Sequence, residues 1–211
     1  MRTVAIGGEL NPENVLAASR RGIFPWYEIP GRPQWYCPEE RCVFFVDTFR
    51  PSKSLQQASR KQNWTLTINK AFRDVMLNCA GNGREDGTWI LPEMIDTYCR
   101  IHEMGYAHSF EVWRENRLVG GLYGICLGRI FCGESMFSIE SNTSKYAFWQ
   151  LVEHVKKLGF YCIDAQVPNP HLMSLGATII TKTHYLKILA EALKSPDLVG
   201  SDFSKLNSTI N

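Results

Sequence analysis

The chain has 211 residues, enough for one full hydrophobic core, or for one core and a small appended domain. An apolar content of 45% and an aromatic content of 12% indicate a folded globular protein and exclude an intrinsically disordered chain. The formal net charge of +2 gives a weak overall field, so a nucleic-acid partner would have to be held by a local basic patch.

Cysteine and histidine usage argues against disulfides and metals. The seven cysteines stand at positions 37, 42, 79, 99, 126, 132 and 162. Their number is odd and no Cys-x-x-Cys pair occurs, which favours reduced, buried thiols. The five histidines have no metal-type spacing, and we predict no metal site. No apolar run reaches the length of a membrane span and the first residues are not signal-like, so we predict a soluble, cytoplasmic protein.

The N-terminal residues predict a small domain over 1–40. A short helix is expected at 12–21, because Asn11 suits the N-cap, Pro12 suits the first helical position and Gly22 suits the stop. The stretch that follows, residues 23–40, is dense in prolines and aromatic residues. Prolines at that density predict a rigid segment without regular structure, which closes the small domain.

From residue 41 onward the pattern alternates between helix and strand, which predicts a second domain over 41–211. Strands are expected at 43–46, 65–68, 108–114, 117–126, 129–136 and 161–167. Helices are expected at 71–80, 92–104, 144–158 and 184–193, and the tail after Pro196 is predicted to fray. The three central strands form an antiparallel meander, so the chain is predicted to have an α+β fold with a central mixed sheet.

Polar residues on two of these strands mark a candidate site. Asp164 and Gln166 are two apart on a predicted strand, so both should face the same side, near its C-terminal end. Glu134 lies among apolar residues on a second strand. Polar groups are costly to bury unless they are paired or in use, so a pocket is the functional interpretation. The structural alternatives are an exposed polar face or an Asp that caps the following loop, and, for Glu134, a position on the outward face of an edge strand.

Nucleophilic catalysis has weaker support. Ser135 lacks the second glycine of a Gly-x-Ser-x-Gly elbow, and Cys132 is better explained as a buried structural thiol. Trp26 and Trp89 fall outside the periodic core patterns, and an indole can stack on a nucleobase. The alternative is that both tryptophans only plug the space between the two domains.

The chain as a whole resembles the leucyl/phenylalanyl-tRNA–protein transferase family. The matching segments are GGEL at 7–10, RGIFPW at 21–26, GTWI at 87–90, HSFEVW at 108–113, LVGGLYG at 118–124, FCGESMFS at 131–138, SK at 144–145, DAQV at 164–167 and SLG at 174–176. The resemblance implies a small N-terminal domain and a C-terminal domain similar to the acyl-CoA N-acyltransferases (GNAT-like). It also implies transfer of Leu or Phe, and less readily Met, from tRNA to proteins with N-terminal Arg or Lys, which marks them for degradation in the N-degron pathway.

The resemblance also implies roles for individual residues. Gln166 would contact the attacking α-amine, Asp164 would orient or polarise Gln166, and Glu134 and Asp164 would offer negative charge to the basic acceptor. Trp26 and Trp89 would sandwich the terminal adenine of the tRNA. The apolar pocket for the transferred side chain would be formed by Leu122, Phe131, Met136 and Ile163. No CoA, metal or other cofactor is expected, and the protein is expected to act as a monomer without membrane attachment.

Two departures from the family pattern affect the expected grip on tRNA. Only six residues precede Gly7-Gly8, so part of the N-terminal domain is expected to be reduced. Thr181-Lys182-Thr183-His184 stands where a more basic pair is expected. Two other functions stay open from the sequence. One is a related non-ribosomal peptidyl transferase that uses aminoacyl-tRNA but adds the amino acid to a cell-wall precursor or small amine, and the other is a catalytically idle tRNA-binding protein.

Overall fold

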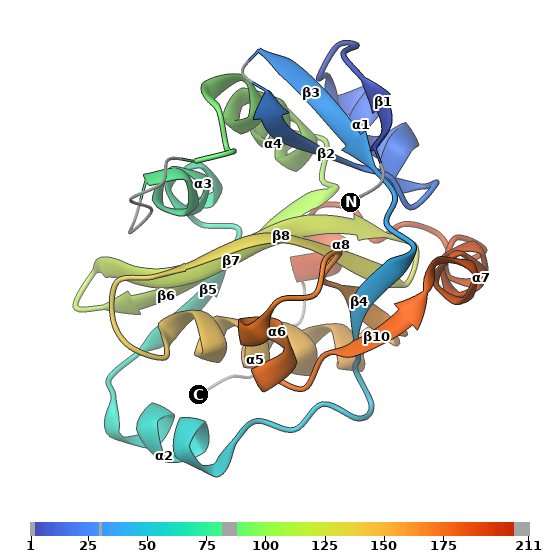
Figure 1. The fold of residues 1–211 in the computed structure, drawn as a ribbon. Helices are drawn as coiled ribbons and strands as arrows, with labels where there is room; N and C mark the ends of the chain where they lie inside the picture. Colours follow the sequence, from blue (N-terminus) through green and yellow to red (C-terminus); the bar gives the residue numbers. More distant parts are fainter. Residues whose placement is uncertain (1–2, 30, 82–87, 205–211) are drawn as a thin grey trace.

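The computed structural model describes residues 3–29, 31–81 and 88–204. Over these residues the chain builds a three-stranded small sheet and a seven-stranded main sheet, with helices on both faces of the main sheet (Figure 1). The small sheet contains, in spatial order, β1 (Thr3–Ile6), β3 (Arg32–Tyr36) and β2 (Phe24–Ile29). The main sheet contains, in spatial order, β10 (Thr178–Thr181), β4 (Glu40–Phe45), β9 (Cys162–Asp164), β8 (Ile130–Ser138), β7 (Arg117–Leu127), β6 (Ala107–Arg114) and β5 (Thr65–Ile68).

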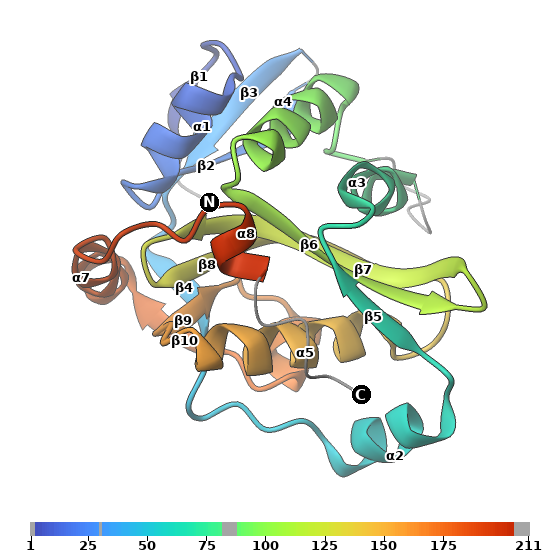
Figure 2. The same ribbon diagram turned by 180° about the vertical axis from the view of Figure 1, so that it is seen from behind.

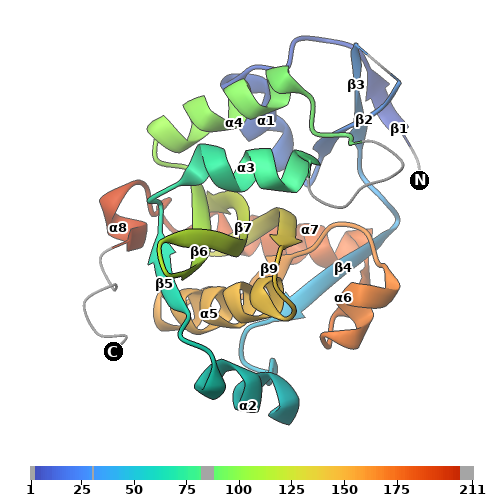
Figure 3. The ribbon, with the colours of Figure 1, turned by 90° about the vertical axis from the view of Figure 1, so that its left-hand side faces the viewer.

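The helices divide between the two faces of the main sheet, as Figures 1 and 2 show. The face that also carries the small sheet is covered by α1 (Pro12–Ser19), α3 (Phe72–Gly81) and α4 (Pro92–Glu103). The opposite face is covered by α5 (Thr143–Lys157), with α2 (Lys53–Lys61) packed beyond it (Figure 3). Near the sheet edge formed by β10 and β4 lies α7 (Lys182–Ala192), and the remaining short helices are α6 (Pro170–Ser174) and α8 (Ser201–Ser204).

The predicted α+β class, the small N-terminal unit and the mixed central sheet are confirmed. β8 and β9 pair in parallel, and the other strand pairs of the described main sheet are antiparallel. The prediction that residues 23–40 lack regular structure is wrong, because they form β2 and β3. Pro25 is tolerated because β2 is an edge strand with a partner on one side, so one side of its backbone makes no ladder bonds.

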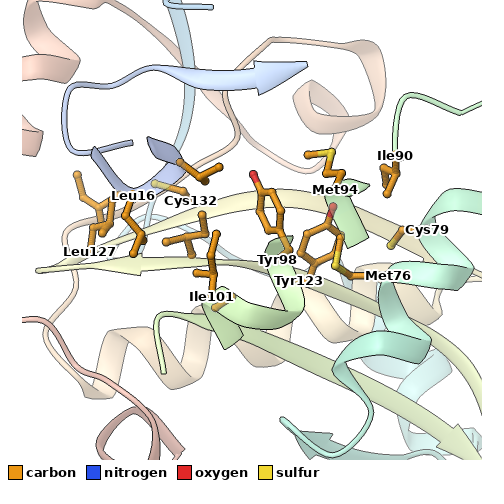
Figure 4. Close-up of a cluster of buried hydrophobic side chains, with 14 of the residues drawn as sticks. Leu16, Met76, Cys79, Ile90, Met94, Tyr98, Ile101, Tyr123, Leu127 and Cys132 are labelled. Carbon is orange, nitrogen blue, oxygen red and sulfur yellow. The ribbon is translucent and has the colours of Figure 1, made fainter. Parts of the chain in front are cut away.

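The hydrophobic core lies in two clusters, one on each face of the main sheet. The first joins α1, α3, α4 and the small sheet to β7 and β8, and Figure 4 shows part of it around Leu16, Met94, Tyr98 and Tyr123. The second lies between the sheet and α5. Because the first cluster contains buried residues from before and after residue 40, the two predicted domains share one core. The division at residue 40 stays a prediction.

The C-terminal segment packs tightly, so the predicted fraying after Pro196 is wrong as far as residue 204. Phe203 is 0% exposed, and its ring stacks on His108 with the centroids 3.9 Å apart. His154 donates from Nε2 to the Phe203 carbonyl oxygen at 2.7 Å. Asp197 pairs with Arg20 and accepts the Gly128 N–H at 2.7 Å. Residues 205–211 lie outside the described residues.

Candidate active site

A cavity opens in the main sheet where β8 and β9 part. Their parallel pairing ends at Cys132 and Asp164, because β9 stops there while β8 continues to Ser138. A cavity of about 400 Å³ occupies the space between the diverging segments, lined by residues 133–136 of β8 and residues 165–169 after β9. The sequence predicted a pocket at these two segments, and the end of pairing explains why it forms there.

The cavity reaches both faces of the sheet. Trp26 of β2 and Trp89, just before α4, line it from the side of the small sheet. Phe148 and Leu151 of α5 line it from the opposite side. One ligand could therefore place an aromatic ring at one end and an apolar side chain at the other.

A β-bulge directs Glu134 toward this cavity. Tyr123 of β7 pairs with Ser135, but the next residue, Gly124, pairs with Gly133, so Glu134 is the extra residue on β8. Residues five apart on a regular strand lie on opposite faces. Yet Cys132 and Phe137 both pack in the core cluster on the side of the small sheet, which one inserted residue explains.

Gln166 does not continue the strand predicted for 161–167. β9 ends at Asp164, and Gln166 has a left-handed backbone with φ of 61°. Its N–H donates to Asp164 Oδ1 at 2.9 Å, and its carbonyl oxygen accepts the Cys42 N–H at 3.1 Å. A non-glycine residue in this region is uncommon and is held there by its surroundings. Its neighbours Ala165 and Val167 also line the cavity.

Asp164 is turned away from the cavity, contrary to the expected shared face. It is fully buried and does not line the cavity. Arg41 donates to it from Nε at 2.8 Å and from Nη2 at 2.5 Å, and the Tyr185 hydroxyl donates to Oδ2 at 2.7 Å. With both oxygens engaged and its charge balanced by Arg41, Asp164 cannot bind the basic group of an acceptor. Its connection to the cavity is through the Gln166 N–H, which donates to Asp164 Oδ1.

Glu134 and Gln166 are in direct contact. Gln166 Nε2 donates to Glu134 Oε2 at 3.2 Å, and both residues line the cavity. Burial raises the pKa of Glu134 to about 7, and the charge of Asp164 adds to the rise. The hydrogen bond from Gln166, the nearby Tyr98 hydroxyl and the charge of Arg41 oppose it. Glu134 is therefore poised to change charge near neutral pH.

Two of the four residues that were predicted to form the apolar pocket line the cavity. Leu122 and Met136 line the cavity, whereas Phe131 and Ile163 do not. Both of these pack in the core between the sheet and α5, on the paired part of β8 and β9, where the sheet is closed. Phe148 and Leu151 were missed. They lie three apart on the predicted helix 144–158, a spacing that an ordinary core face also produces.

Trp26 and Trp89 share the cavity but do not form the expected sandwich. Their ring centroids are 5.6 Å apart and the planes are inclined by 57°. The two rings touch, so a planar base cannot lie between them in this arrangement. What they offer is an aromatic wall on which a base could stack from one side.

Other reactive groups near the cavity are arranged less favourably for catalysis. Cys132 is buried, and burial together with the charges of Asp164 and Glu134 raises the pKa of its thiol, which disfavours the thiolate. Within the described ranges no cluster of three or more His, Cys, Asp or Glu residues is arranged to hold a metal. None of the helices in the described part of the chain is long and apolar enough to cross a membrane.

Comparison with known proteins gives one consistent result. A family model described as leucyl/phenylalanyl-tRNA protein transferase matches residues 43–190, and one for the N-terminal domain of that transferase matches residues 8–39. A leucyl/phenylalanyl-tRNA–protein transferase of Shewanella denitrificans is 49% identical over 189 residues, covering 89% of this chain and 80% of the relative. The protein of that name from Idiomarina loihiensis is 45% identical over 197 residues, covering 92% of this chain and 84% of the relative.

Among solved structures the likeness is distant. The structure of L-PGS from Bacillus licheniformis aligns with a TM-score of 0.41 at 15% identity, over 64% of this chain and 49% of that chain. A TM-score this low carries no conclusion about function. The sequence relatives, which span most of both chains, are the stronger comparison.

Proposed function

Because the chain belongs to the leucyl/phenylalanyl-tRNA–protein transferase family, we propose that the cavity between β8 and β9 is its transfer site. Aminoacyl-tRNA is the donor of the family and a protein is the acceptor. In the finer proposal, leucine or phenylalanine, and less readily methionine, passes to proteins that begin with arginine or lysine and marks them for degradation. The monomer, acting in the cytoplasm where tRNA is charged, needs no cofactor for this step.

The reaction requires alignment more than strong acid–base chemistry. An aminoacyl ester is already activated, so the site has to hold an amine against its carbonyl carbon. The Gln166 amide oxygen is suited to accept an N–H of the neutral α-amine, although a neutral amide is too weak a base to keep the proton. A C–N bond forms, the C–O bond to the ribose breaks, and the proton ends on the ribose hydroxyl. An α-amine with a pKa near 8 is already partly neutral at pH 7.

The two ends of the cavity suit the two ends of an aminoacyl-adenosine. Leu122, Met136, Phe148 and Leu151 form an apolar end that can hold a leucine or phenylalanine side chain. The Trp26–Trp89 wall at the other end can stack on the terminal adenine. Pocket shape can disfavour β-branched side chains, although a single methyl group is worth only about 1–3 kcal/mol.

The contact between Gln166 and Glu134 is the observation that carries the proposal. It places a carboxylate beside the amide that would hold the attacking amine. When ionised, Glu134 can attract the cationic side chain of an N-terminal arginine or lysine. This explains a basic acceptor preference without Asp164.

Transfer from labelled tRNA to a peptide tests the proposal. Leu-, Phe- and Ile-tRNA are incubated with the protein and a Lys-initiated peptide, with an N-acetylated copy and an Ala-initiated copy as controls. We expect Leu and Phe to label the Lys-initiated peptide and Ile to label it far less, with little label on either control. Labelling of a small amine or cell-wall precursor in place of the peptide would contradict the proposal and favour the related transferase.

A further inference from the structure

Three buried side chains form a closed polar network directly behind the cavity. Arg41, Asp164 and Tyr185 are 2%, 0% and 1% exposed, and they come from β4, β9 and α7. A buried charge is costly unless it is paired and hydrogen-bonded. Here Arg41 and Asp164 balance each other. Burial lowers the pKa of Arg41, but the charge and hydrogen bond of Asp164, together with Tyr185 and Cys132, outweigh it and raise that pKa above its usual range.

Each oxygen of the Asp164 carboxylate accepts two hydrogen bonds. Its Oδ2 accepts bonds from Arg41 Nη2 at 2.5 Å and from the Tyr185 hydroxyl at 2.7 Å. Its Oδ1 accepts bonds from Arg41 Nε at 2.8 Å and from the Gln166 N–H at 2.9 Å. Gln166 is therefore attached to a carboxylate whose orientation is fixed by Arg41 and Tyr185.

This attachment matters because Gln166 has an unfavoured backbone. A left-handed conformation is costly for a side chain with a Cβ and persists where its surroundings impose it. Asp164 holds the N–H of Gln166, and Cys42 holds its carbonyl oxygen. If the carboxylate turned, the backbone could relax and carry the amide of Gln166 away from Glu134.

Arg41 reaches the aromatic wall of the cavity as well. Its Nη1 donates to the Gly22 carbonyl oxygen at 3.0 Å, in the left-handed turn just before β2. The guanidinium lies 4.9 Å from the centroid of the Phe24 ring and 4.3 Å from that of Tyr185. Phe24 and Trp26 of β2 line the cavity. One side chain thus connects the Gln166 side of the cavity to the strand that carries Trp26.

We propose that Arg41 and Tyr185 are positioning residues of the transfer reaction, which hold the Gln166 amide in place through the Asp164 carboxylate. The Tyr185 hydroxyl donates to Oδ2 of Asp164 and in this way helps to hold Gln166. Arg41 holds Gln166 through Asp164 and also holds β2, the strand that carries Trp26 of the aromatic wall. This inference rests on the proposed function, because it assigns the two residues to the alignment of the attacking amine.

A double-mutant cycle tests the role of Tyr185. Tyr185→Phe keeps the ring and removes the hydroxyl, and we expect it to lower kcat about tenfold while KM changes less than about twofold, since small misplacements are costly in alignment. In a Gln166→Ala background the same change should have no further effect, because its target is gone. Tyr27→Phe is the matched control. It removes the hydroxyl of a buried tyrosine that interacts with Glu93 and does not line the cavity, and it should leave kcat unchanged.

The outcomes separate this inference from the proposed function. An equal loss of kcat in both backgrounds, or no loss in either, would overturn the positioning role while transfer by the unmodified protein still stands. Hydrogen exchange of the Gln166 amide gives a readout that does not depend on transfer. Tyr185→Phe should accelerate that exchange, and the amides of β6 should be unaffected; an unchanged Gln166 amide would overturn the inference even if no transfer were found.

A conservative change at Arg41 tests its wider reach. Arg41→Lys keeps the charge but cannot reproduce the paired bonds to Asp164 together with the bond to Gly22. We expect it to lower kcat, as Tyr185→Phe does, and also to raise KM for aminoacyl-tRNA several-fold through the aromatic wall. An effect on kcat alone would remove Arg41 from the aromatic wall.

Discussion

At the scale of single residues, backbone geometry decides which polar groups reach the cavity. Glu134 enters it because the strand carries one extra residue, and Gln166 enters it because its backbone is left-handed. The sequence could predict that these residue types belong to a site. It could not predict the bulge, which depends on the register with β7, or that Asp164, two residues from Gln166, would point the opposite way.

The pKa of Glu134 predicts a steep pH dependence of transfer. Burial raises it to about 7, so the carboxylate becomes neutral as the pH falls below that value. The acceptor amine becomes protonated over the same range. The logarithm of kcat/KM for a Lys-initiated peptide should therefore rise with a slope of about two below pH 7 and about one between pH 7 and 8.

Glu134→Gln is the control for that profile. The variant should keep a slope of about one throughout and should lose preference for Lys-initiated over Ala-initiated peptides. The raised pKa also means that ionisation of Glu134 opposes folding. The stability that neutral Glu134 contributes is present below its ordinary pKa of 4.5 and is lost as the pH rises to about 7. The free energy of unfolding of the wild type should therefore fall relative to that of the variant over that window. An unchanged profile and preference would remove Glu134 from acceptor binding.

Trp89→Ala should weaken the donor end of the site. Loss of one stacking surface costs about 1–3 kcal/mol, which corresponds to a KM for aminoacyl-tRNA raised about fivefold to 150-fold. The effect on kcat should be smaller, because the indole does not contact the reacting carbonyl in the proposed arrangement. Steady-state kinetics with Trp149→Ala as control would check this, since Trp149 is half-buried on α5 and does not line the cavity. A larger loss in kcat than in KM would contradict the stacking role.

At the scale of elements, a helix or strand could be predicted from the sequence where its own apolar residues repeat with the period of that element. The meander and α5 were predictable because their apolar residues are periodic. α2 was missed because Leu55 is its buried residue and the other residues, apart from Ala58, are polar, so no continuous apolar stripe marks the helix. β2 and β3 were missed because prolines usually break strands, and only the sheet order reveals that β2 is an edge.

α5 also lines the apolar end of the cavity, so a substitution on this helix should change which amino acid is preferred for transfer. Leu151→Phe would fill the apolar end and should reduce transfer of phenylalanine about tenfold more than transfer of leucine, since the larger side chain loses its space. Val152→Leu, a neighbouring buried change that does not face the cavity, should leave the ratio unchanged. Competition between Phe-tRNA and Leu-tRNA measures it, and an unaltered ratio would place the transferred side chain elsewhere.

α8 contributes to stability through one side chain. Phe203→Ala should lower the free energy of unfolding by about 3–5 kcal/mol, because it empties a fully buried site between His108, His154 and Phe131. Chemical denaturation would measure the loss, and the exposed Ser201→Ala is the control. A loss below about 1 kcal/mol would mean that the C-terminal segment is dispensable for the fold.

At the scale of the whole molecule, the site is assembled from residues that are far apart in the sequence. Arg41 and Asp164 are separated by 123 positions, and the tryptophans come from β2 and from the segment before α4. The residue types at the site could be chosen from the sequence with the help of the family resemblance. Their division between the two faces of the sheet, the contact between the indoles, and the placement of Phe131 and Ile163 in the closed core depend on where β9 ends.

A crystal structure with an amide-linked 3′-phenylalanyl-adenosine analogue would test the central claim most directly, namely that one cavity through the sheet holds both ends of the donor. We predict the adenine against Trp26 or Trp89, the phenyl ring among Met136, Phe148 and Leu151, and the linking carbonyl beside Gln166. Binding of the analogue outside the cavity, or with the phenyl ring at the tryptophans, would contradict the claim.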